Sequence, residues 1–226
     1  MGKGCTAVIV AAGTAQRMQG IDKMLTELGG VPLLLRTVRA LAVSERIDEI
    51  VIVTREALLS QVRTLCCEEK KLRCVVCGGD NRAASVLCGL EAVKTDLVAV
   101  HDGARPLVTA EVIDEAVKAA EAYGAAAPAV AVHDTIKIAR DGMVEQTPDR
   151  STLFAVQTPQ VFYTETLRQA LLSAMEQGIP LTDDCSAMEA AGHPVHLTAG
   201  SEENLKITVP SDLILAEAIL KRRERT

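Results

Sequence analysis

Four short apolar runs alternate with amphipathic segments in the first half of the chain. The runs at residues 6–10, 49–53, 73–76 and 96–100 are rich in β-branched side chains and carry charge at most at their ends, which is typical of strands buried on both faces of a sheet. Between them, residues 32–41, 56–66 and 82–93 place apolar side chains at three- and four-residue spacing, as one face of a helix does. This repetition predicts an α/β fold with a mostly parallel sheet and helices on both faces.

The second half of the chain continues this alternation and then departs from it. Thr109 is suited to cap a helix, and residues 125–132 supply a further strand. From about 133 to 150, alternating polarity around the turn Arg140-Asp141-Gly142 predicts a hairpin with few apolar residues to anchor it in the main core. An apolar stretch at 154–162 and helices at 165–176, 183–191 and 211–223 follow without a linker or repeat, so one domain is expected over residues 1–226.

Composition and charge narrow the possible partners. With 226 residues, 48% of them hydrophobic, the chain can bury one sizeable core. A net charge of -6 and an aromatic content of 2% argue against a surface that binds a nucleic-acid polymer or anionic lipid.

The N-terminal apolar run leads into a glycine loop, unlike a cleaved signal, and no uncharged run reaches the roughly 18 residues of a membrane span, so a cytoplasmic protein is expected. Seven cysteines, an odd number, are interpreted as reduced thiols.

Three loops follow predicted strands and carry the candidate chemistry. In the first, Ala11-Ala12-Gly13 leads to Arg17 and Lys23 at the carboxyl end of a strand, where α/β sheets bind ligands. Small residues let backbone N–H groups approach phosphate oxygens, while Arg17 and Lys23 can neutralise a triphosphate. The loop has the spacing of neither a dinucleotide fingerprint nor a P-loop, and an ordinary strand-to-helix turn explains its glycine equally well.

The other two loops add a possible base pocket and a carboxylate. Gly78-Gly79-Asp80, with Ser85 one turn into the next helix, could present hydrogen bonds to the edge of a base, although a capped turn explains the same residues. Asp102 follows the run at 96–100 and can hold a divalent cation through its oxygens; Mg²⁺ is the usual companion of a nucleoside triphosphate. Arg105 could bind a second phosphate, or the charged pair could be structural.

Taken together, these loops resemble those of the 2-C-methyl-D-erythritol 4-phosphate cytidylyltransferase family, whose members act in isoprenoid precursor synthesis by the non-mevalonate route. The similarity covers nearly the whole chain through further motifs: Asp134-Thr135, Asp149-Arg150, Gln157-Thr158-Pro159-Gln160, Thr182-Asp183-Asp184 and Asn204-Leu205-Lys206-Ile207-Thr208. The resemblance implies a Rossmann-like three-layer nucleotidyltransferase fold with a protruding β-arm at about 133–150, through which two copies form a homodimer. It also implies transfer of CMP from CTP to a polyol phosphate, with release of pyrophosphate.

The resemblance also implies a role for individual residues. Catalytic roles on the reacting phosphates fall to Arg17, Lys23 and Lys206. Nucleotide binding is implied for Ala11, Ala12, Gly13, Gly79, Asp80, Ser85 and Asp102, and Asp102 would also position Mg²⁺. Acceptor binding is implied for Arg105, Thr135, Arg150, Thr158 and Thr182. Two positions of the first loop differ from the family pattern, since Ala15 replaces a glycine and Asp22 replaces the proline before Lys23.

The chemistry of the reaction agrees with this set of residues. Nucleotidyl transfer needs alignment and charge neutralisation more than a covalent group, so the acceptor phosphate can attack the α-phosphorus of CTP without a protein nucleophile. Two alternatives stay open: a related cytidylyltransferase that uses ribitol 5-phosphate or another polyol phosphate, and a non-catalytic nucleotide-binding regulatory protein of the same fold. The motifs at 134–135 and 149–150, together with Thr182, favour methylerythritol phosphate. The retention of four separated charged site residues speaks against lost activity.

Overall fold

The structure is a computed structural model and describes residues 2–13 and 22–225. At its centre, strands β6 (Thr95–Asp102), β1 (Gly2–Ala11), β4 (Glu49–Thr54) and β5 (Leu72–Cys77) lie side by side and parallel in that order. Val8 of β1 lies between Val51 of β4 and Val100 of β6, so β-branched side chains pack against one another across the sheet. These four strands are the runs that the hydrophobic pattern predicts.

The sheet continues beyond β6 with strands of mixed direction. β11 (Gln160–Tyr163) runs antiparallel to both β6 and β7 (Ala125–Ala131). β10 (Phe154–Val156) also pairs with β7 in antiparallel orientation. β12 (His196–Ala199) lies parallel to β7. The predicted parallel core is therefore confirmed, but the apolar stretch at 154–162 forms two short strands that run against it, and β12 has no counterpart in the prediction.

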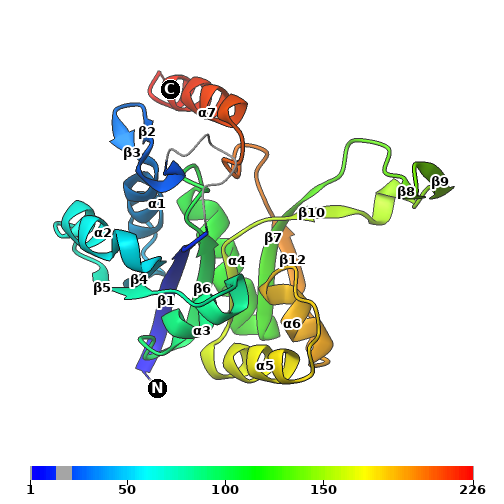
Figure 1. The fold of residues 1–226 in the computed structure, drawn as a ribbon, viewed down its shortest axis with the longest axis horizontal. Coiled ribbons are helices and arrows are strands. Elements are labelled where there is room, and N and C mark those ends of the chain that lie inside the picture. The colour runs from blue at the N-terminus through cyan, green and yellow to red at the C-terminus, as the bar shows by residue number, and fades with distance from the viewer. Residues whose placement is uncertain (1, 14–21, 226) are drawn as a thin grey trace.

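Helices cover both faces of the sheet, as predicted (Figure 1). The helices span Leu33–Ala42 (α1), Leu59–Cys66 (α2), Arg82–Leu90 (α3), Ala110–Tyr123 (α4), Thr164–Glu176 (α5), Asp184–Ala190 (α6) and Pro210–Arg223 (α7), with short 3-10 helices at Lys23–Leu25 (η1), Glu56–Leu58 (η2) and Arg150–Thr152 (η3). Neighbouring residues of β1 point to opposite faces of the sheet. Ile9 belongs to the core beneath α1, α2, α4 and α7, whereas Val8 belongs to the core beneath α3, α5 and α6. Within the described ranges, no helix is both long and apolar enough to cross a membrane.

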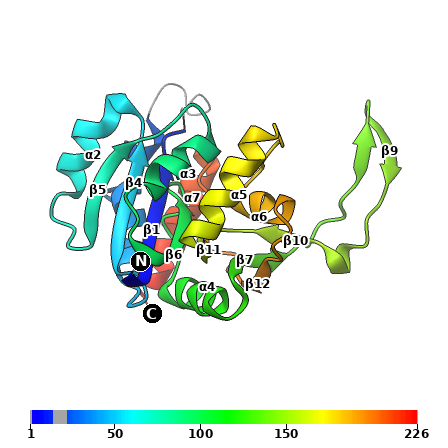
Figure 2. The ribbon, with the colours of Figure 1, turned by 90° about the horizontal axis from the view of Figure 1, so that it is seen from below.

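Two small hairpins stand apart from the main sheet. One consists of β2 (Glu27–Leu28) and β3 (Val31–Pro32). The other, β8 (Ile138–Arg140) with β9 (Met143–Gln146), projects from the body of the protein (Figure 2). Its turn residues Asp141 and Gly142 have φ angles of 50° and 81°, the left-handed region that suits a tight two-residue turn. Strand pairing begins at Ile138, a few residues inside the predicted range of about 133–150, and residues 133–147 are all exposed.

A chain of hydrogen bonds joins the end of β6 to the turn before β11. The Thr158 hydroxyl accepts from the backbone N–H of Asp102 at 3.0 Å and lies 3.0 Å from Nδ1 of His101. Nε2 of His101 lies 3.1 Å from the carbonyl of Arg105. All three contacts are satisfied when the imidazole is neutral, donates through Nε2 and accepts through Nδ1. Complete burial fits this state, because it lowers the pKa of His101 to about 4.

Acidification should therefore weaken the fold through His101. The unfolded chain binds a proton near the ordinary pKa of 6.5, whereas the folded chain resists protonation until about pH 4, so this stabilisation is complete above pH 6.5 and is lost as the pH falls toward 4. Between pH 7 and pH 5, the free energy of unfolding should fall by about 2 kcal/mol on account of this residue. Urea denaturation at pH 7 and at pH 5 should show a smaller decrease in the free energy of unfolding for His101→Asn than for the wild type. An equal decrease in both proteins would contradict this role of His101.

Candidate active site

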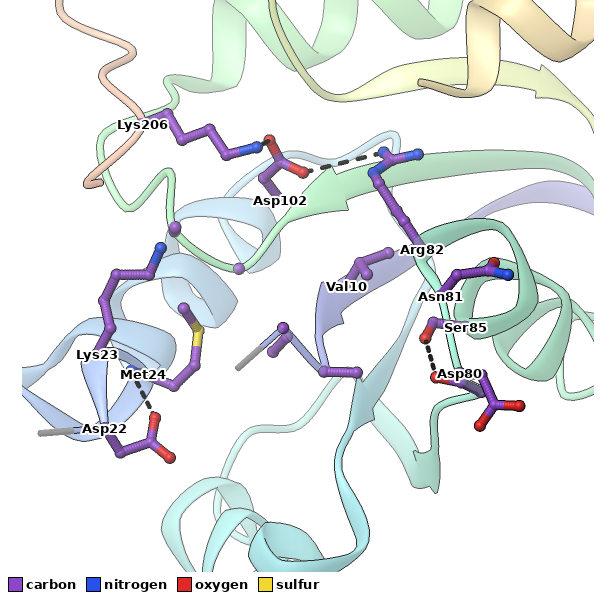
Figure 3. A pocket seen from close by; sticks show the side chains of 16 residues that line it. Val10, Asp22, Lys23, Met24, Asp80, Asn81, Arg82, Ser85, Asp102 and Lys206 are labelled. Carbon is purple, nitrogen blue, oxygen red and sulfur yellow. Dashed lines mark hydrogen bonds and ion pairs between the residues drawn. The ribbon is translucent and has the colours of Figure 1, made fainter. Parts of the chain in front are cut away.

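The carboxyl ends of β1, β5 and β6 meet at one edge of the sheet, beside a pocket of about 380 Å³ (Figure 3). This volume is typical of small-ligand sites. The predicted residues that line it come from the three loops and from the segment after β12: Ala11, Ala12, Gly13, Lys23, Gly79, Asp80, Ser85, Asp102 and Lys206. Strand order explains why they meet, because Val10 of β1 lies directly opposite Asp102 of β6.

The loop between β5 and α3 forms a closely packed wall of the pocket. Asn81 caps α3 by accepting a hydrogen bond from a backbone N–H of the first turn at 2.9 Å, as helix N-termini favour. A Cβ on Gly78 would lie 2.7 Å from both Cβ of Ala12 and Oγ of Ser85, so this approach of two loops requires glycine. The Ser85 hydroxyl donates to the Gly79 carbonyl at 3.3 Å, and its oxygen can still accept a hydrogen bond.

Three cationic side chains surround the carboxylate of Asp102. Nζ of Lys206 lies 2.8 Å from Oδ2, and Nε of Arg105 lies 3.5 Å from the same oxygen. On the other side, Nη2 of Arg82 lies 3.9 Å from Oδ1 (Figure 3). Burial by itself would raise the pKa of Asp102, but these cations together hold it below its usual value, so the carboxylate is ionised at neutral pH.

The segment that carries Lys206 is fixed from several directions. The backbone N–H of Ile207 donates to the carbonyl of Ala104 at 2.8 Å, and Nη1 of Arg105 donates to the carbonyl of Asn204 at 2.6 Å. Nζ of Lys23 donates to the carbonyl of Ile207 at 2.9 Å. These contacts bring the predicted catalytic residues Lys23 and Lys206 to the same pocket, although they are far apart in the sequence.

Arg82 is a pocket residue for which the sequence pattern predicts no separate role. Its Nη2 lies 2.7 Å from Oδ2 of Asp184, a carboxylate whose side chain is fully buried. Burial raises the pKa of Asp184, although Arg82 opposes this shift. Asp184 stands in the Thr182-Asp183-Asp184 motif, but nothing in the spacing reveals that it pairs with a residue 102 positions away. The pair aims the Arg82 guanidinium at the same carboxylate that Lys206 contacts.

Three predicted site residues are not among the described residues that line the pocket. Thr158 is buried, and its hydroxyl is engaged by His101 and the Asp102 backbone, which favours a positioning role over contact with an acceptor. Arg105 adjoins the pocket through Asp102 without being among its lining residues. Arg17, together with the variant position Ala15, lies outside the described residues.

The remaining acceptor-binding predictions fall on exposed segments. Thr182 is exposed just before α6, where Asp183 and Ser186 form a capping box. Thr135 and Arg150 are exposed at the base of the β8–β9 arm, and Nη1 of Arg150 donates to the carbonyl of His133 at 2.6 Å. The structure thus does not bring Thr135 and Arg150 into the pocket of their own chain.

The single carboxylate of Asp102 suits a metal cation that takes most of its ligands from a substrate. Across the part of the chain that the structure describes, no three His, Cys, Asp or Glu side chains form a metal-binding group. Mg²⁺ is commonly held by one or two carboxylates together with phosphate oxygens and water, and Asp102 supplies one such carboxylate inside the pocket. The residues therefore fit Mg²⁺ that arrives with a triphosphate and do not form a cage for a metal alone.

The sequence matches a known family over almost its whole length. Residues 5–222 match the family described as IspD, 2-C-methyl-D-erythritol 4-phosphate cytidylyltransferase. The chain belongs to this family. It is 44% identical over 221 residues to the enzyme of that name from Geobacillus kaustophilus, with 96% of this chain and 97% of that protein covered. Its identity to the one from Desulforamulus reducens is 45% over 228 residues, with 96% of each chain covered.

Solved structures share the fold. The crystal structure of 4-diphosphocytidyl-2C-methyl-D-erythritol synthase from Anaerococcus prevotii superposes with a TM-score of 0.87 at 30% identity, covering 97% of this chain and 96% of that one. The Thermus thermophilus 2-C-methyl-D-erythritol 4-phosphate cytidylyltransferase gives a TM-score of 0.80 at 32% identity, covering 95% and 98%. The chain is thus a nucleotidyltransferase with the predicted three-layer fold.

Arg82 provides a test of the site geometry. Arg82→Ala should lower kcat/KM about 10- to 100-fold, because it removes a cation that faces the pocket. Arg82→Lys should recover part of the loss, since it keeps the charge without the planar fork that reaches both carboxylates. The matched control is Arg168→Ala, which removes an arginine that donates to the carbonyl of Leu90 at the other end of α3. Equal kcat/KM values for Arg82→Ala and Arg168→Ala in steady-state kinetics would show that Arg82 does not act on the substrates.

Proposed function

We propose that this chain transfers CMP from CTP to 2-C-methyl-D-erythritol 4-phosphate and releases pyrophosphate. Membership in the family supports the reaction, and the convergence of Lys23, Lys206 and Arg82 on one small pocket is the observation that carries it. An oxygen of the acceptor phosphate forms a bond to the α-phosphorus of CTP. The bond from that phosphorus to the bridging oxygen of the β-phosphate breaks, and pyrophosphate leaves with the electron pair. Such a displacement requires alignment and charge neutralisation.

The wall made by the β5–α3 loop is proposed to select the base. The Gly79 carbonyl can accept from the exocyclic amino group of cytosine, and the Ser85 hydroxyl offers a second polar contact to the base edge. Gly78 packs so closely against Ala12 and Ser85 that no side chain fits between them, and this closely packed wall is proposed to favour a pyrimidine over a purine. Backbone groups of Ala12 and Gly13 at the end of β1 are proposed to face the phosphates.

The cations of the pocket are proposed to neutralise the charge that develops on the phosphates. Lys23 and Lys206 lie in the pocket, and the family resemblance adds Arg17 to this group. Asp102 is proposed to hold Mg²⁺, which when bound would neutralise phosphate charge. Preorganised charge of this kind is often the largest contribution to such catalysis.

The β8–β9 arm is proposed to make a homodimer and to complete the acceptor site of a second copy. Ile138, Met143 and Val144 of the arm are 46%, 74% and 58% exposed, and an isolated hairpin is marginally stable in water. A twofold partner would cover these side chains on both chains at once. Arg150 and Thr135 lie on this arm and away from the pocket of their own chain, which supports action across the interface. We further infer one domain per chain and a cytoplasmic location.

Pyrophosphate release separates the candidate functions. With CTP, Mg²⁺ and 2-C-methyl-D-erythritol 4-phosphate, release should exceed that with ATP or GTP by about 100-fold, because a polar pocket discriminates strongly against a base that leaves its groups unpaired. A preference for ribitol 5-phosphate would identify the related cytidylyltransferase instead. Binding of CTP without release with any polyol phosphate would identify the non-catalytic nucleotide-binding protein.

Mixed dimers test whether Arg150 serves the partner. Lys23→Ala and Arg150→Ala chains, each inactive as its own dimer, are mixed in equal amounts under conditions where subunit exchange is shown by mass spectrometry. If Arg150 acts across the interface, each mixed dimer has one site with both defects and one with neither, so about a quarter of the wild-type sites should return. No recovery of pyrophosphate release after exchange would place Arg150 in the site of its own chain.

A further inference from the structure

Asp22 places a negative charge in the wall of a pocket that is proposed to bind a polyanion. It lines the pocket directly before Lys23 (Figure 3), and its side chain is 16% exposed. A carboxylate at this position would repel a triphosphate at short range. The charge must therefore be compensated if Lys23 is to attract the phosphates.

The two carboxylate oxygens of Asp22 have different partners. Oδ1 accepts from the backbone N–H of Met24 at 3.0 Å and caps η1, the short helix that begins with Lys23. Oδ2 forms an ion pair with Nη2 of Arg55. The backbone carbonyl of Asp22 also accepts from the N–H of Leu25 at 3.0 Å. One residue thus fixes the turn that presents Lys23, while its charge is directed toward Arg55.

Arg55 reaches Asp22 from a well-fixed part of the sheet. It follows β4, which lies between β1 and β5, and its carbonyl accepts from the N–H of Leu58 at 3.0 Å at the start of η2. Its guanidinium therefore extends from the same carboxyl edge that carries the pocket loops. Most exposed ion pairs contribute little to stability, but this one has a carboxylate that belongs to the pocket wall.

We propose that Arg55 is a positioning residue that neutralises Asp22 and so allows Lys23 to act on the triphosphate of CTP. This inference rests on the proposed function for its ligand. It assigns to Arg55, which is not among the residues that line the pocket, an effect on CTP affinity through Asp22. Arg55 is not proposed as a catalytic residue, because its guanidinium reaches the pocket wall only through Asp22.

The test compares CTP binding by calorimetry and pyrophosphate release for variants of the full-length chain. Arg55→Ala should weaken CTP binding and raise the KM for CTP on the order of tenfold at low ionic strength, because the charge of Asp22 is then uncompensated. The loss should shrink in high salt, which screens partly exposed charges. Arg55→Gln, which keeps hydrogen-bonding groups on a long side chain, should show a similar loss and guards against a folding defect in the alanine variant.

The decisive variant is Arg55→Ala combined with Asp22→Asn. Asparagine keeps an oxygen that can cap Met24 and removes the charge, so the double variant should regain most of the CTP affinity that Arg55→Ala loses. If Arg55→Ala lowered the CTP affinity only by disturbing the structure, Asp22→Asn would not restore it, because the ion pair is absent from the single and the double variant alike. The matched control is Arg73→Ala, which breaks an exposed 2.8 Å pair with Glu49 on the neighbouring strands and should bind CTP as the wild type does.

Two results would overturn the inference: wild-type CTP affinity in both Arg55 variants, or no recovery when Asp22→Asn is added. Failure of the proposed function would give a different result. A wild-type chain that binds CTP but releases no pyrophosphate would overturn the proposed activity, while the CTP affinities of the Arg55 variants would still decide the role of Arg55.

Discussion

The ion pair between Asp102 and Lys206 is the contact on which the arrangement of the pocket depends. Asp102 ends β6 and is only 8% exposed, so its carboxylate needs cationic partners to remain charged. Lys206 comes from the segment after β12, and the hydrogen bond from Ile207 to Ala104 holds that segment beside the same turn. The charges that stabilise Asp102 are therefore already in place in the structure, so the proposed binding of a triphosphate would need little reorganisation.

Thr158 connects both halves of this ion pair. Its hydroxyl accepts from the backbone N–H of Asp102, and its carbonyl accepts from Nδ2 of Asn204 at 3.0 Å, two residues before Lys206. The neighbouring His101 is neutral because burial lowers its pKa, so it fixes the turn without adding a further charge. A buried network of neutral groups thus supports the charged groups that face the pocket and restricts how far they can move.

The sequence predicts those parts of the molecule that depend on local patterns. The β-branched runs identify β1, β4, β5 and β6, and because parallel strands share a carboxyl edge, they also predict that the loops with Lys23, Gly79 and Asp102 meet. The reversed direction of β11 and the addition of β12 depend on tertiary packing and leave no periodic signal. The pairing of Arg82 with Asp184 and the burial of Thr158 likewise depend on contacts between distant segments.

Asp22 departs from the family pattern but adopts a φ angle that the usual residue would also impose. The family places a proline before the lysine, and proline fixes φ near −65°; Asp22 adopts a φ of -68°. Proline rigidifies such a turn covalently, whereas Asp22 does so by accepting from Met24. The second solution introduces a charge that the first lacks, and Arg55 supplies the opposite charge from the neighbouring strand. The two residues therefore form one unit, because Asp22 without Arg55 would fix Lys23 in place while opposing the attraction for phosphate that is proposed for Lys23.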